Sequence, residues 1–306
     1  MSLRIDKGTL LVRDGFTHWP QERTELRFFK GDLSLPPKII MLDGSGTLSF
    51  DAVSWMAEQD VALVRVDYRG NVASIFGGSR VAYDPDRVRW QVETRADPKR
   101  RLEFCCDLIA EKIGGTIETM RTALPDSPAR SVAFEAAEKA IDRLERRSVQ
   151  TVNDVLMIEA GAARRYFAAW RGLPLWWPTR MKTPIPPAWR AAEGRASVTD
   201  RKGRTNRHAT HPVNAMLNYA YAVLHSQVRL EAVSEGYDPR LGIMHESRDD
   251  AQALVLDFME ARRPKVDAAV LKFIAGQMLS AGDFAIRADG VCRLAPQLAR
   301  RVCDLV

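Results

Sequence analysis

At 306 residues the chain is long for one hydrophobic core, so two domains are the default expectation. Hydrophobic residues make up 46% and charged residues 27% of the chain, a composition typical of ordinary soluble globular proteins. The net charge of +6 is too small to indicate nucleic-acid binding unless it is concentrated in one segment.

The sequence also bears on the compartment. No apolar run approaches about 18 residues, which argues against a membrane-spanning helix, and the first residues do not have the pattern of a signal peptide. The four cysteines, Cys105, Cys106, Cys292 and Cys303, form no CxxC pair. We therefore expect a cytoplasmic protein with no membrane association and with reduced thiols.

Three short segments rich in branched apolar residues, 9–12, 38–42 and 61–66, predict strands in the first part of the chain. Each is bounded by Gly, Asp or Pro, which are typical of turns. A short helix is expected over 51–59. These signals predict a small β-rich domain over residues 1–85.

After residue 86 the apolar residues repeat with the period of a helix. Asp97 followed by Pro98 predicts a helix start, with Asp as the N-cap and Pro at the first position. Further helices are expected over 128–147, 152–170, 212–235, 250–263 and 266–280. The expected fold class is α+β, in which the N-terminal β-rich domain is followed by a linker over 86–96 and a larger all-α domain over 97–306.

Positive charge is concentrated in one segment. Residues 180–211 hold eight Lys or Arg residues and two acids, an excess equal to the net charge of the whole chain. Phosphate backbones select such a strip, although a solvated basic loop explains the charge alone equally well. The best candidates for DNA contacts are Arg201, Lys202, Arg204 and Arg207, and a second, weaker set is Lys99, Arg100 and Arg101.

Three acidic residues, Glu159, Asp257 and Glu260, lie in helical segments that are otherwise largely apolar. Burying an unpaired carboxylate costs several kcal/mol, so such groups are paired, hydrogen-bonded or bound to metal. Together with His245, they could share one divalent ion. Alternatively, each residue has an ordinary structural role: ion pairs of Glu159 with Arg164 or Arg165 and of Asp257 and Glu260 with Arg262 and Arg263, and a hydrogen-bonded loop position for His245.

At this point the sequence resembles a known family, the CRISPR-associated spacer-acquisition integrases and endonucleases. The resemblance lies in the turn of the β-domain, the first catalytic helix around Glu159, a helix opening, the loop that carries His245, and the acidic helix with Asp257 and Glu260. The order Glu, His, Asp, Glu with these neighbours is specific. The segments outside the Glu159 helix are Leu42–Ser49, Thr210–Tyr221, Gly236–His245 and Leu256–Pro264.

The resemblance implies a metal site formed by Glu159, His245 and Glu260, with Asp257 close by to order a water or assist proton transfer. Carboxylates and one imidazole suit Mn²⁺ or Mg²⁺, and no cysteine ligand is available for structural zinc. The implied activity is that of a metal-dependent DNA integrase and endonuclease of CRISPR adaptation. It would join the 3′-hydroxyl ends of short foreign DNA fragments into the CRISPR array by transesterification.

The resemblance also implies partners: double-stranded DNA (both fragment and CRISPR array), a second copy of the chain bound through the N-terminal β-domain, and a small ferredoxin-like adaptation protein. Two other functions stay open at this stage. One is a metal-dependent nuclease or branched-DNA processing enzyme without productive integration. The other is a catalytically idle DNA-binding scaffold.

Overall fold

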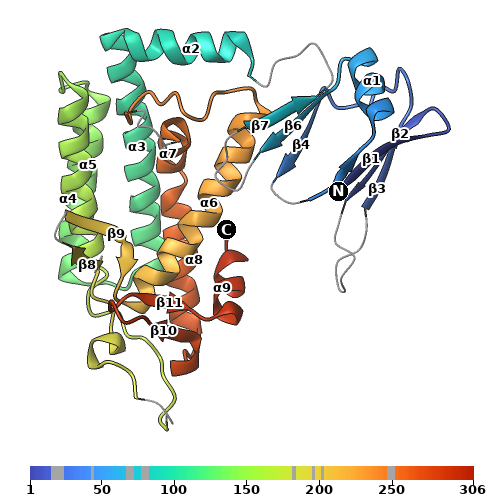
Figure 1. The fold of residues 1–306 in the computed structure, drawn as a ribbon. Helices are drawn as coiled ribbons and strands as arrows, with labels where there is room; N and C mark the ends of the chain where they lie inside the picture. Colours follow the sequence, from blue (N-terminus) through green and yellow to red (C-terminus); the bar gives the residue numbers. More distant parts are fainter. Residues whose placement is uncertain are drawn as a thin grey trace. The chain divides into compact units, whose positions relative to one another are not determined.

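The computed structural model describes most of the chain (Figure 1), in the ranges 1–14, 24–42, 45–66, 72–76, 83–180, 184–194, 197–200, 203–246 and 252–306. It divides into two compact units. Unit 1 is Met1–Val92 with Arg229–Pro239, and unit 2 is Glu93–Val228 with Arg240–Val306. No helix in these ranges is both long enough and apolar enough to span a membrane.

Unit 1 is built from two small sheets and one short helix. In the first sheet, in the order β3-β2-β1-β5, β2 is antiparallel to β1 and β3, and β5 is parallel to β1. In the second, β6 lies parallel to β4 and antiparallel to β7. The elements are β1 (Ser2–Asp6), β2 (Thr9–Asp14), β3 (Thr24–Phe28), β4 (Lys38–Leu42), β5 (Thr47–Leu48), α1 (Phe50–Glu58), β6 (Ala62–Val66) and β7 (Val72–Phe76).

Local chemistry explains how unit 1 begins. The turn between β1 and β2 places Lys7 and Gly8 at φ values of 51° and 79°, the left-handed pair that a tight two-residue hairpin requires. Helix α1 is capped by the Ser49 side chain and packs Trp55 and Met56 into the core. The Trp55 indole N–H donates to the Gly8 carbonyl at 3.1 Å, so helix and hairpin are tied together.

Unit 2 is mostly helical. Helices α2 and α6 contribute residues to both units. The α-helices are α2 (Pro85–Ala96), α3 (Pro98–Ala123), α4 (Pro128–Glu145), α5 (Val152–Ala168), α6 (Pro212–Ser234), α7 (Ala253–Glu260), α8 (Arg263–Gly276) and α9 (Pro296–Cys303). The smaller elements are the 3₁₀ turns η1 (Pro187–Arg190) and η2 (Ala281–Asp283) and the hairpins β8 (Ser197–Asp200) with β9 (Gly203–Ala209) and β10 (Phe284–Ile286) with β11 (Cys292–Leu294).

The starts of three helices follow from side-chain capping. Asp97 accepts from the amides of Lys99 and Arg100, which confirms the N-cap predicted for α3. Ser127 caps α4, and Thr151 forms a reciprocal capping box with the third residue of α5. The α5 cap fixes the start of the helix that carries Glu159.

Helix α3 is the central element of unit 2, since it packs against α4, α5, α7 and α8 (Figure 1). Its closest approach to α8 is made possible by Gly115, where a Cβ atom would lie 3.0 Å from the Cβ of Pro264. One turn later Thr119 donates its hydroxyl to the Pro264 carbonyl at 2.8 Å. Gly115 therefore sets how closely the start of α8, and the end of α7 just before it, lie against α3.

Aromatic packing orders part of the segment between α5 and α6. Trp177 and Trp189 stack with ring centroids 6.3 Å apart, and both rings contact Phe284 of β10. The two indole N–H groups donate to backbone carbonyls, Trp177 to Trp189 and Trp189 to Thr210. The segment thus packs against the second hairpin of unit 2.

The fold class predicted from the sequence is confirmed: N-terminal sheets are followed by a mostly helical region, which in addition carries the two hairpins. The boundary differs in detail from the expectation. Where a linker is expected over 86–96, the structure has α2, and Arg229–Pro239 belong to the N-terminal unit.

Candidate active site

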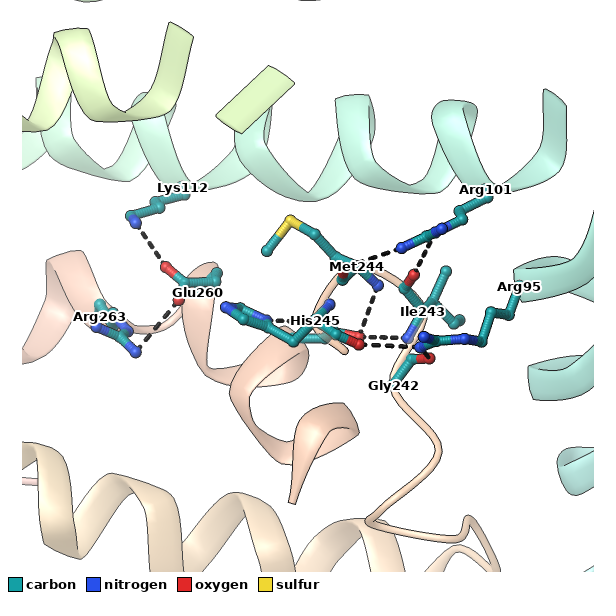
Figure 2. A network of polar contacts seen from close by, with 10 residues as sticks. Arg95, Arg101, Lys112, Gly242, Ile243, Met244, His245, Glu260 and Arg263 are labelled. Atoms are coloured by element: carbon teal, nitrogen blue, oxygen red, sulfur yellow. Dashed lines mark hydrogen bonds and ion pairs between the residues drawn. The ribbon is translucent and has the colours of Figure 1, made fainter. Parts of the chain in front are cut away.

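The acidic residues singled out in the sequence lie on two helices of unit 2. Glu159 is on α5, while Asp257 and Glu260 are one turn apart on α7. His245 precedes α7 in the segment that leads from α6. Figure 2 shows His245 and Glu260 in the same polar network, with Lys112 of α3 and Arg263 of α8 beside Glu260.

Asp257 is a fully buried carboxylate, with 0% of its surface exposed. Its oxygens accept from the amides of Ile243, Met244 and His245 at 2.6, 3.0 and 2.9 Å. Oδ1 also lies 2.7 Å from Nδ1 of His245. Because an ionised carboxylate only accepts, Nδ1 carries the proton and Nε2 is left for another partner. Asp257 therefore fixes both the loop and the orientation of the imidazole.

The carbonyls of the same loop point to two arginines (Figure 2). Arg95 donates from Nη1 to the Gly242 and His245 carbonyls at 2.5 and 2.9 Å. Arg101 donates from Nε to Ile243 at 2.8 Å and from Nη2 to Met244 at 3.3 Å. The four carbonyls from 242 to 245 and the three amides from 243 to 245 are thus all bonded to charged side chains. The loop that presents His245 is held from both sides.

Glu260 and Glu159 meet at a single ammonium group. Nζ of Lys112 lies 2.6 Å from Oε1 of Glu159 and 2.5 Å from Oε2 of Glu260. Nη2 of Arg263 lies 3.2 Å from Oε1 of Glu260. Burial acts to raise the pKa of Glu260, but Arg263 and Lys112 outweigh it and hold the pKa below its ordinary value. Glu260 is therefore an ionised carboxylate in a nearly buried position.

One oxygen of this cluster is incompletely satisfied. Oε2 of Glu260 is buried and receives no hydrogen bond of acceptable angle, so its short contact with Lys112 is an ion pair only. In the part of the chain that the structure describes, no three His, Cys, Asp or Glu side chains are close enough together to hold a metal ion. Two hard carboxylate oxygens that converge on one cation, with an imidazole held by Asp257 nearby, nevertheless have the donor chemistry that suits Mn²⁺ or Mg²⁺.

A cavity of about 520 Å³ opens beside Glu159. Its lining includes Lys112, Glu159 and two arginines, Arg164 and Arg171, whose side chains form no hydrogen bond or ion pair within the described ranges. An aspartate also lines it, Asp267 of α8, but its oxygens accept from the hydroxyls of Tyr166 and Tyr221. Within the described part of the chain, the cavity therefore offers unpaired positive charge beside Glu159 and Lys112.

These contacts show which ion pairs the glutamates form, and the pair of Glu260 with Arg263 is one of those expected for an ordinary structural role. Glu159 pairs with Lys112 rather than with Arg164 or Arg165, and Glu260 pairs with Arg263 as well as with Lys112. Sequence reasoning missed Lys112. A signal was present, because the lysine falls at helical spacing within the buried stripe of α3 formed by Cys105, Leu108, Ile109 and Thr116.

The structure describes only some of the residues predicted to contact DNA. Arg201 and Lys202 lie outside the described residues, and Arg204 and Arg207 lie on β9 with side chains outside the description. In the second set, Arg101 is used to hold the His245 loop, whereas Arg100 is exposed and lies near Glu93 and Asp97. A further residue, His211, caps the start of α6: its Nδ1 accepts from the Val213 amide at 3.3 Å.

The fold and the site define an α+β protein in which a helical unit carries two glutamates paired to one lysine and a histidine oriented by an aspartate. A family model described as CRISPR associated protein Cas1 matches residues 37–306. The chain belongs to the Cas1 family, as the sequence resemblance predicts.

Relatives support this assignment. The chain is 28% identical to a CRISPR-associated endonuclease Cas1 of Pyrobaculum aerophilum over 270 residues, which cover 88% of this chain and 78% of the relative. It is 27% identical to a CRISPR-associated endonuclease Cas1 of Francisella tularensis subsp. novicida over 279 residues, covering 88% and 75%.

Solved structures share the fold. A casposase bound to integration product aligns with a TM-score of 0.69 at 20% identity and covers 99% of this chain and 82% of its own. A Cas1 protein from Thermotoga maritima aligns with a TM-score of 0.57 at 13% identity, covering 99% and 86%.

Proposed function

We propose that this chain is a metal-dependent DNA integrase and endonuclease of CRISPR adaptation. It joins the 3′-hydroxyl ends of short foreign DNA fragments into the CRISPR array by transesterification. The observation that carries the proposal is that Glu159 and Glu260, on different helices, converge on one cation beside an imidazole whose orientation is fixed by Asp257. Similar proteins were solved as a casposase bound to integration product and as a Cas1–DNA complex, which supports DNA as the substrate.

Each residue has a separate task in this proposal. Glu159, Glu260 and Nε2 of His245 are the proposed ligands of Mn²⁺ or Mg²⁺, which would polarise the scissile phosphate and stabilise charge in the transition state. Glu260 contributes a carboxylate whose lowered pKa keeps it ionised. Arg164 and Arg171 line the adjoining cavity and offer guanidinium groups to phosphate oxygens.

Asp257 has a positioning task in this proposal. Its oxygens accept from three amides and one imidazole, and none of its surface is exposed, so the attacking hydroxyl and a mobile water cannot reach it. This differs from the role in proton transfer that the family resemblance implies. Asp257 acts through His245, by holding the ring so that Nε2 faces away from the carboxylate.

Partners follow the family. Similar Cas1 chains were solved in a Cas6-RT-Cas1–Cas2 complex and in a DNA complex. We propose that this chain acts as a homodimer through its N-terminal β-domain and assembles with a small ferredoxin-like adaptation protein. Arg201, Lys202, Arg204 and Arg207 stay the proposed contacts to the duplex.

The second candidate is a nuclease without productive integration, and it is favoured by the name endonuclease that the relatives carry. Strand transfer separates the two. A labelled fragment, a supercoiled plasmid carrying a repeat, and Mn²⁺ are incubated with wild type, Glu159→Gln or His245→Asn. The matched control is Glu135→Gln, which removes an exposed acid of α4.

Integration predicts a joined product that requires the 3′-hydroxyl of the fragment and disappears in both site variants but not in the control. A fragment with 3′-dideoxy ends would leave plasmid cleavage intact if the protein is only a nuclease. Cleavage without joining, in the presence of the partner protein, would contradict the integrase proposal.

A further inference from the structure

The two glutamates of the site share one cation that belongs to the protein. The Lys112 ammonium lies within 2.6 Å of an oxygen of each glutamate. The side chains are 16% exposed for Lys112, 21% for Glu159 and 6% for Glu260, so little water screens the three charges. Two carboxylates this close repel each other strongly unless a cation lies between them.

Lys112 is bound only through its charge on the Glu260 side. Oε2 of Glu260 has no hydrogen bond of acceptable angle, while Oε1 faces Arg263 (Figure 2). The Lys112 ammonium therefore compensates the charge of Oε2 but does not give it a hydrogen bond. A divalent ion that binds carboxylate oxygens directly would meet it fully.

We propose that Lys112 is a resident cation which the divalent metal replaces, so that metal binding and release of the Lys112 ammonium are one exchange. The inference rests on the proposed function for the identity of the metal ligands. The exchange adds a role for Lys112, which lowers the apparent affinity of the site for metal. Before metal binds, Lys112 also keeps Glu159 and Glu260 together. Lys112 thus pre-organises the two carboxylates, but it also competes with the metal ion for them.

The neighbouring cavity gives the released side chain room. Lys112 itself lines this space of about 520 Å³, as does Thr116 one turn further along α3. The cavity also holds Arg164 and Arg171, whereas its aspartate, Asp267, is occupied by two tyrosine hydroxyls. An ammonium that leaves the glutamates therefore joins two arginines that have no ion pair within the described residues, and it raises the positive charge available to a phosphate group. Loading of the metal prepares the cavity for DNA.

Mn²⁺ affinity of the free protein tests this exchange without any turnover. Titration calorimetry and the EPR signal of free Mn²⁺ are measured on wild type, Lys112→Gln and Lys112→Arg, with Lys139→Gln of α4 as an exposed lysine control. We expect Lys112→Gln to bind Mn²⁺ on the order of tenfold more tightly, because one positive charge beside the ion is gone. Lys112→Arg and Lys139→Gln should bind like wild type.

Thermal unfolding gives a second readout. Without metal, Lys112→Gln should melt below wild type, since the two glutamates then repel, and saturating Mn²⁺ should close most of that gap. Unchanged or weaker Mn²⁺ binding in Lys112→Gln, with a folded far-UV spectrum, would overturn the exchange. If Mn²⁺ binds wild type and Glu159→Gln equally, the proposed metal site fails instead, and with it the basis for the exchange.

Discussion

Asp257 and Glu260 are neighbouring carboxylates on one face of α7, yet they are used in opposite ways. Asp257 accepts four hydrogen bonds, three from the backbone and one from the imidazole of a single loop. Glu260 faces the charged ends of Lys112 and Arg263 and has an oxygen without a hydrogen bond.

The contacts of the two carboxylates suit two different roles, a structural role for Asp257 and a binding role for Glu260. Directed hydrogen bonds from buried amides fix geometry and cannot be exchanged without opening the loop. An ion pair to a flexible lysine side chain is less directional, so a competing cation can replace it. We infer that Asp257 determines where His245 lies and that Glu260 determines what the site holds.

Removing Asp257 should have the largest effect. Asp257→Ala leaves three buried amides without an acceptor, so we expect a loss of about 3–5 kcal/mol in the free energy of unfolding. Urea denaturation measures it. Strand transfer should be lost as well, since nothing then orients His245. A loss below about 1 kcal/mol would contradict the structural role of Asp257.

Removing Arg95 should test the opposite side of the loop. Arg95→Ala frees the Gly242 and His245 carbonyls, so we expect a loss of roughly 2 kcal/mol in stability. Amide hydrogen exchange in residues 240–246 should become faster. Arg100→Ala is the matched control, because Arg100 is exposed and close only to surface acids. Equal exchange rates in both variants would show that Arg95 does not hold the loop.

Replacing Glu260 should give the reverse of the Asp257 result. Glu260→Gln keeps the volume of the side chain but removes the charge that Arg263 and Lys112 stabilise, while Lys112 keeps its pair with Glu159, so we expect a stability loss of about 1–2 kcal/mol. Strand transfer should fall by at least about 100-fold, since a proposed ligand is lost. Stability and activity measured on the same preparation decide this. A variant that is as unstable as Asp257→Ala would remove the distinction between the two carboxylates.

His211, like Asp257, is a buried polar residue with fixed hydrogen bonds, but it lies away from the acidic residues. We expect it to have the smallest effect on stability. Burial lowers the pKa of His211 below the ordinary value of 6.5, and its neutral ring accepts from Val213 and donates to the Ala191 carbonyl. The unfolded chain therefore takes up a proton first as the pH falls, and stability decreases below about pH 6.5 by at most about 1.4 kcal/mol per pH unit.

The melting temperature between pH 7.5 and 5.5 measures this contribution. His211→Asn can still cap α6 but does not titrate, so its melting temperature should fall less over the same range. Parallel pH profiles of the two proteins would mean that other groups cause the decrease.

Sequence reasoning succeeded where one residue type carries the signal. The segments 38–42 and 61–66 form β4 and β6 within a residue of the expectation, and Asp97 caps α3. The β10–β11 hairpin could not be found in this way, because its two strands have three residues each, too few to show a periodicity.

The sequence suggests the residues of the candidate site, but it does not predict how they are arranged. Glu159 and Glu260 are 101 positions apart, and only the packing of α3 against α5 and α7 brings them to Lys112. Likewise, nothing in the run around Asp257 specifies that its acceptors serve backbone amides 12 to 14 residues earlier. Tertiary contacts decide such roles, and periodicity describes only one face of one helix.

Gly115 gives the site its width. It lies three residues after Lys112 on α3, and its contact Pro264 lies four residues after Glu260, so the two pairs are stacked along the same helix interface. A single methyl group at position 115 would act as a wedge between α3 and α8 and would lengthen the reach from lysine to glutamate. The ion pairs of the two glutamates thus depend on Gly115, which has no side chain and therefore allows the short distance between α3 and α8.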